Sequence, residues 1–131
     1  MTNYSDIDLD LEKYIFLMNA EEGNHGIYLL TWELGHHDIT IEDKYKIARQ
    51  LLTELLKNGL LILEKFTDDT LDNKIGIVSL DKIDTILNNP SNWYPCNKIY
   101  AIVITEKGNK YLADYCKGDN IDKVNKRIMA K

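Results

Sequence analysis

Few residues in this chain have the types and the spacing that catalysis or metal binding requires. His36, His37 and Asp38 are consecutive, and neighbouring side chains on a tight turn rarely converge on a single ion. Cys96 follows Pro95 without a general base placed beside it, and no nucleophile-elbow, phosphate-loop or zinc-protease motif occurs. The many carboxylates fit a solvated surface. We therefore expect a non-enzymatic protein that has no metal site and no cofactor.

A row of polar side chains points to a different chemistry, the reading of nucleic acid. Residues that could bond bases and phosphates recur at helical spacing opposite an apolar stripe: Lys46, Arg49, Gln50, Thr53 and Lys57. Glu42 and Asp43 oppose this interpretation, because their charge at the start of the helix would meet phosphates. A solvated outer face is the simpler explanation, and DNA contact is the alternative.

An acidic turn and an aromatic loop suggest recognition of a protein instead. The turn holds Asp68, Asp69 and Asp72, and the loop holds Trp93 and Tyr94. Carboxylates steer association with a basic partner, while tryptophan and tyrosine act as buried anchors at interfaces. These residues are therefore the preferred partner contacts. The competing interpretation places Trp93 in the core beneath the loop.

Periodicity and end signals predict the helices that carry these residues. A long helix begins after Thr40, which with Asp43 resembles a capping box, and ends at Asn58-Gly59. Its apolar stripe repeats every four residues, as Ile47/Ala48, Leu51/Leu52 and Leu55/Leu56. Two shorter helices, over residues 8–22 and 26–34, complete a three-helix head. The second contains Trp32 among leucines, which predicts that Trp32 belongs to the core.

Two antiparallel strands are expected after the head, over residues 60–66 and 99–104, with β-branched and aromatic residues that suit a sheet. The segment between them, residues 67–98, is too long for a structureless connection. It predicts a short third strand over 75–78 and a helix that begins after Ser79 and ends before Pro90. A helix capped by Thr105 follows over 106–116, and the tail, residues 118–131, is expected to be weakly ordered or helical.

Length and charge limit the classes of function. The 131 residues suit one domain over 1–131, and the net charge of −5 with a pI near 5.1 opposes nonspecific attraction to nucleic acid. The first 22 residues are mainly acidic and the last segment is mainly basic. The N-terminus lacks the positive start and apolar run of a signal peptide, so we expect a cytoplasmic protein that does not associate with a membrane.

Two stretches resemble winged helix-turn-helix regulators of the MarR and PadR kind. LLTELLKNGLLILEKF resembles their recognition helix and first wing strand, and IVITEKGNKYL resembles their second wing strand and the following helix. The middle stretch, DKIDTILNNPSNWYPCNKIYAIVITEKG, is similar to small bacterial winged-helix-like proteins thought to act as immunity proteins against polymorphic or contact-dependent toxins. The resemblance implies an α+β fold with an insertion in the wing and a toxin as partner.

The sequence thus favours a protein-binding module, an antitoxin that occludes the active site of a co-encoded toxin such as a nuclease. The alternative is a winged-helix DNA-binding transcriptional regulator that uses the polar face over residues 46–57. The sequence does not indicate the oligomeric state.

Overall fold

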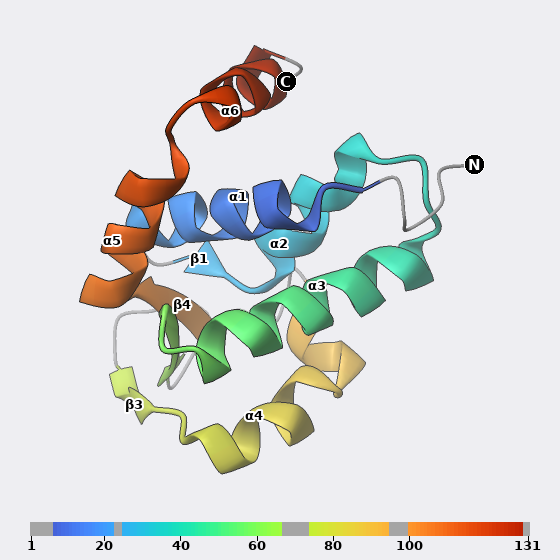
Figure 1. The fold of residues 1–131 in the computed structure, drawn as a ribbon. Coiled ribbons are helices and arrows are strands. Elements are labelled where there is room, and N and C mark those ends of the chain that lie inside the picture. The colour runs from blue at the N-terminus through green and yellow to red at the C-terminus, as the bar shows by residue number, and fades with distance from the viewer. Residues whose placement is uncertain (1–6, 23–24, 67–73, 95–99, 130–131) are drawn as a thin grey trace.

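Figure 1 shows a computed structural model of the chain, which describes residues 7–22, 25–66, 74–94 and 100–129. It contains both helices and strands. Their order is α1 (Leu9–Glu22), β1 (His25–Gly26), α2 (Tyr28–Glu33), the 3₁₀ helix η2 (Leu34–His36), α3 (Ile41–Lys57), β2 (Leu61–Phe66), β3 (Lys74–Ile77), α4 (Leu80–Leu87), the 3₁₀ helix η3 (Pro90–Trp93), β4 (Tyr100–Ile104), α5 (Glu106–Tyr115) and α6 (Asp119–Met129).

The strands form one antiparallel sheet in the order β1-β4-β2-β3. β2 and β4 pair from Leu61↔Ile104 to Lys65↔Tyr100, although the insertion separates them in the sequence. β3 adds to the other side of β2, and β1 adds to β4. The predicted α+β class is confirmed, and the two strands predicted over residues 60–66 and 99–104 pair antiparallel as expected. The predicted elements lack β1, because a strand of two residues has no periodicity to detect.

Local signals set both ends of α3. The Thr40 side chain accepts a hydrogen bond from the Asp43 N–H at 3.1 Å, as the capping pattern predicts. At the other end Gly59 has φ +76°, and the Leu60 N–H donates to the Leu55 carbonyl at 3.0 Å. This bond and the positive φ form a Schellman motif. The chain therefore turns directly from α3 into β2.

The hydrophobic core includes residues of α1 and α3. Phe16 and Leu17 of α1 are fully buried, and so are Leu51 and Leu52 of the α3 stripe. In Figure 1, α3 runs between α1 and α4, and both helices contact it. The predicted apolar stripe of α3 is confirmed, since all of its members are buried.

A glycine permits the close approach of α5 to β2. Thr105 caps α5 by accepting from the Gly108 N–H, and its hydroxyl also bonds the Gly59 carbonyl at 2.6 Å. A β-carbon on Gly108 would collide with the Leu60 carbonyl oxygen. Any larger residue at this position would push α5 away from the strand.

A buried ion pair attaches α6 to the head. The Arg127 guanidinium bonds both carboxylate oxygens of Glu12 and also donates to the Glu33 carbonyl. His37 Nε2 lies 2.6 Å from the same Glu12 carboxylate. Glu12 is fully buried, so the expectation that every carboxylate is solvated is wrong for this residue. The bidentate geometry compensates for the cost of burying both charges.

No helix within the described residues is long and apolar enough to cross a membrane.

Candidate functional site

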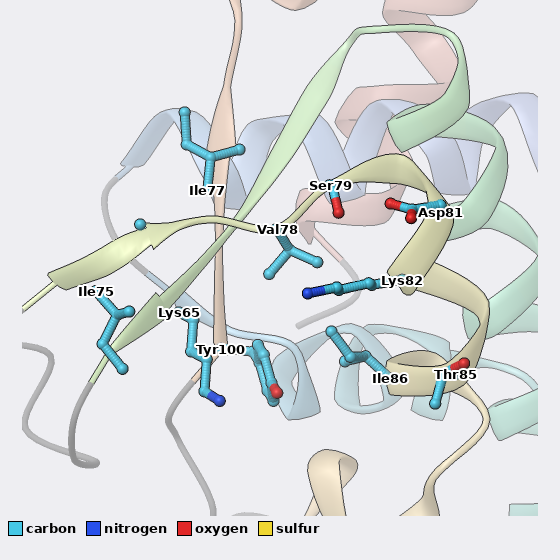
Figure 2. A pocket seen from close by; sticks show the side chains of 11 residues that line it. Lys65, Ile75, Ile77, Val78, Ser79, Asp81, Lys82, Thr85, Ile86 and Tyr100 are labelled. Carbon is cyan, nitrogen blue, oxygen red and sulfur yellow. The ribbon is translucent and has the colours of Figure 1, made fainter.

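A hollow of the described surface lies between the sheet and α4, and we call it the insert groove. It has a volume of about 540 Å³. Its lining comes from the paired strands β2 and β4 and from the segment between them: Lys65 of β2, Tyr100 of β4, Ile75 to Ser79 of β3 and the turn that follows, and Asp81, Lys82, Thr85 and Ile86 of α4. Residues far apart in sequence therefore meet around one space (Figure 2).

A β-bulge exposes the apolar side chains of β3. Lys65 pairs with Gly76, but Phe66 pairs with Lys74, so Ile75 is the extra residue on its strand. A bulge redirects the side chains next to it, and Figure 2 shows Ile75 and Ile77 on opposite sides of β3. Both isoleucines are more than half exposed, as is Leu80 at the start of α4. An apolar rim therefore surrounds the edge of the sheet.

Two lysines supply the positive charge of the groove. Figure 2 shows the side chains of Lys65 and Lys82 reaching toward the space between β3 and α4. Lys65 Nζ lies 5.9 Å from the centre of the Tyr100 ring, a cation–π contact. Neither ammonium group forms an ion pair with a residue in the described part of the chain. Both are available to an anionic group of a ligand.

A third lysine and an aspartate of this region already have partners. Lys74 Nζ lies 2.8 Å from the Glu64 carboxylate. A hydrogen bond from the Ser79 side chain to Asp81 holds the pKa of that carboxyl below its usual value, and a backbone hydrogen bond adds to the effect. Asp81 is therefore ionised at neutral pH, and it adds one negative charge to a lining that also holds Lys65 and Lys82.

The groove has a firm wall because α4 is fixed to the body of the protein. Ile83 and Leu87 are buried, and α4 packs on α3. At its C-terminal end, Asn92 Nδ2 donates to the Ile86 carbonyl at 2.9 Å and Trp93 Nε1 donates to the Leu87 carbonyl at 2.8 Å. Carbonyl groups in the last turn of a helix lack helical partners. Side chains of η3 supply those partners here.

The predicted partner contacts have different outcomes. Asp68, Asp69 and Asp72 lie outside the described residues. Trp93 is only 1% exposed, so its assignment as a partner contact is wrong and the core interpretation holds. The reason is the bond from its indole to α4, together with an edge-to-face contact with Tyr45 whose ring centres are 6.0 Å apart. Tyr94 is 48% exposed and remains accessible.

The polar face of α3 is partly engaged by the insertion. Lys57 Nζ lies 3.7 Å from the Asp84 carboxylate of α4, and Arg49 borders a hollow together with Pro90 and Trp93. Lys46 lies 3.7 Å from Glu42 on the same helix. Gln50 is exposed and Thr53 is half-buried. The face is not a continuous row of free donors, as a groove-reading helix would present.

The prediction for Trp32 is also wrong, but here a residue expected in the core is exposed. The sequence predicts a core residue, but the side chain is 71% exposed. The buried residues of α2 and its flanks are Ile27, Leu30 and Leu34. Trp32 follows Leu30 by two residues, which correspond to about 200° of helical rotation. It therefore points away from the core that its neighbours fill.

Trp32 borders a second hollow, which we call the Trp32 hollow. Its volume is about 360 Å³, and it lies between α2 and the first turns of α3. The lining residues are Thr31, Trp32, Gly35, Ile41, Lys44 and Tyr45. The sequence analysis missed this site. The helical rotation between Leu30 and Trp32 could have predicted it, because that rotation turns Trp32 away from the apolar face of α2.

Among the described residues, no group of histidine, cysteine and carboxylate side chains is arranged to hold a metal ion. No family model, curated protein or solved structure matches this chain.

Proposed function

We propose that the chain is a winged-helix protein-binding module whose contact surface is the insert groove. The observation that carries this proposal is the apolar rim: Ile75 and Ile77 are each more than half exposed and line one groove, and the exposed Leu80 follows at the start of α4. Large apolar side chains grouped on a surface are typical of protein interaction sites. The strand edge and the two unpaired lysines add polar groups that would orient a partner.

The connectivity supports the winged-helix part of the proposal. Three helices precede the antiparallel pair β2 and β4, which matches the head and wing implied by the sequence resemblance. The structured insertion, with β3, α4 and η3, replaces the tight loop of an ordinary wing. The exposed apolar rim therefore belongs to the segment in which the chain differs from an ordinary wing.

The partner that we propose is a co-encoded toxin, which the module would neutralise by covering its substrate site. In this proposal the rim packs on the toxin, and Lys65 and Lys82 pair with carboxylates beside its substrate site. Asp68, Asp69 and Asp72 would steer association through long-range attraction to basic residues around a nuclease cleft. The module acts by binding and needs no catalytic group of its own.

The test begins with the product of the neighbouring gene, or with a partner co-purified from the source cells. Binding of wild-type protein to it is compared with that of Ile75→Glu and Ile77→Glu. A charge in an apolar contact should weaken binding by at least about tenfold. Ile128→Glu on α6 is the matched control, because Ile128 is also about half exposed but lies outside the groove. Normal binding by both groove variants, with the fold intact, would reject the groove as the contact surface.

The aspartates need a separate measurement, because charge steering acts on rates. Replacing Asp68, Asp69 and Asp72 by asparagine should slow association and reduce its dependence on salt, with little change in the dissociation rate. An unchanged association rate at low salt would remove the acidic turn from the proposal.

A DNA-binding regulator is the second candidate, supported by the exposed positions of Lys46 and Gln50 on α3. The position of α4 beside α3 weighs against it, because Asp84 already pairs with Lys57. Gel shifts with the promoter of the chain's own gene provide the test. Specific binding at about 10⁻⁸ M or tighter in physiological salt would reverse the ranking.

A further inference from the structure

We infer that the Trp32 hollow is a self-association surface that takes a second copy of this chain about a twofold axis. It is a different surface from the insert groove, so this inference does not depend on the identity of the partner proposed above. It begins with an unusual exposure. Trp32 and Ile41 are each 71% exposed, and they border the same hollow from different helices.

The patch has the composition of an interface centre. Tryptophan and tyrosine contribute disproportionately to binding free energy, because a large rigid surface is buried at a small cost in conformational entropy. Here Trp32 and Ile41 project, while the half-buried Tyr45 forms part of the recess. A projecting group beside a recess is what a twofold contact needs, since each copy supplies both to the other.

The charges of the patch complement one another. Lys44 lines the hollow and forms no ion pair with a residue in the described ranges. Glu42 borders the adjoining hollow, and Tyr45 lines both. The Glu42 side chain is 80% exposed, and it pairs with Lys46 at 3.7 Å on the same helix. In a twofold contact the Lys44 of each copy can face the Glu42 of the other, so the same patch is complementary to itself.

The supporting scaffold is rigid. Thr40 caps α3 directly before Ile41, and Tyr45 packs edge-to-face on the buried Trp93. On the other side, Leu30 and Leu34 anchor α2 and η2 in the core. Little ordering is therefore required when the surface is covered, which favours association.

The experiment is sedimentation velocity of the full chain over a range of concentrations. We expect a dimer to be populated at about 100 μM protein, within the range of specific but transient contacts. Trp32→Ala should raise the dimer dissociation constant about thirtyfold or more, which equals a hot spot of about 2 kcal/mol. Ile128→Ala is the control variant, and it should leave the dimer unchanged.

Charge reversal distinguishes this geometry from a general loss of apolar surface. Lys44→Glu and Glu42→Lys should each weaken the dimer, and the double variant should restore it, since the pairs are rebuilt across the axis. Circular dichroism of each variant checks that α3 keeps its fold, because Glu42 lies in its first turn. The inference is overturned by a wild-type monomer at about 100 μM, the concentration at which a specific transient dimer is populated. A dimer that Trp32→Ala leaves intact, or a double variant that stays monomeric, also contradicts it.

Discussion

The two tryptophans of this chain lie in opposite surroundings. Trp93 is enclosed between α4 and α3, with its indole N–H bonded to the Leu87 carbonyl. Trp32 projects from α2 and has no hydrogen bond to its indole among the described contacts. The difference shows what buries an aromatic side chain here. The end of α4 offers Trp93 a carbonyl group that needs a donor, whereas the core beside α2 is already filled by leucine and isoleucine.

The two tryptophans should therefore affect different free energies, that of unfolding and that of association. Trp93 connects the insertion to the head, so it should act on the free energy of unfolding. Trp32 covers no core and should act on association. The insert groove needs the wall that Trp93 supports, whereas the Trp32 hollow needs an accessible ring.

The largest expected effect is that of Trp93→Ala. The change removes a fully buried aromatic ring and leaves the Leu87 carbonyl without its donor, and we expect a loss of about 3–5 kcal/mol of unfolding free energy. Urea melts followed by circular dichroism measure it. Trp93→Phe keeps most of the ring but not the N–H, and should cost about 1–3 kcal/mol. A loss below about 1 kcal/mol for Trp93→Ala would place the ring outside the core.

Leu55→Ala provides the calibration for this effect. Leu55 belongs to the buried stripe of α3, which contacts α1 and β2. A large-to-small change in such a position costs about 2–5 kcal/mol. The same urea melts apply, with an unchanged m-value as the check on two-state unfolding. A cost well under 1 kcal/mol would contradict the core assignment of the stripe.

The contact between Tyr45 and Trp93 should be measurable as a coupling. In a double-mutant cycle with Tyr45→Leu and Trp93→Leu, we expect an interaction energy of about 0.5–1.5 kcal/mol, typical of aromatic pairs. Tyr45→Leu combined with Ile128→Ala is the control, and these distant changes should add within about 0.5 kcal/mol. Additivity in the aromatic pair would show that the Trp32 hollow is not supported by the insertion.

Much of the fold was predictable because its signals are local. The cap at Thr40, the positive φ at Gly59 and the apolar stripe between them fix α3 within a short stretch of sequence. The helix after Thr105 begins with a similar local signal, a side-chain cap. The long-range contacts were not predictable in this way. Glu12 and Arg127 meet across 115 residues, and a single sequence has no pattern that pairs them.

The candidate site was harder to predict than the fold for the same physical reason. The bulge that exposes Ile75 depends on the register of β3 against β2. The burial of Trp93 depends on a carbonyl at the end of another helix, while the sequence shows only an aromatic loop flanked by prolines. For Trp32, a helix of six residues is too short for composition to identify its inner face, and the leucines around it suggested the wrong side.

The smallest expected effect on stability is that of Trp32→Ala, and it is the sharpest test of the division between the two tryptophans. Because the ring is 71% exposed, its removal should change the unfolding free energy by no more than about 0.5 kcal/mol, as for other surface substitutions. The measurement is made at low protein concentration, where self-association does not add to stability. Fluorescence of the single-tryptophan variants gives an independent readout: acrylamide should quench Trp32 in the Trp93→Phe protein much more strongly than Trp93 in the Trp32→Ala protein. Raising the concentration of the Trp93→Phe protein should then protect Trp32 from quenching, since the second copy covers it. A cost above about 2 kcal/mol for Trp32→Ala, or equal quenching of the two rings, would mean that both tryptophans are structural.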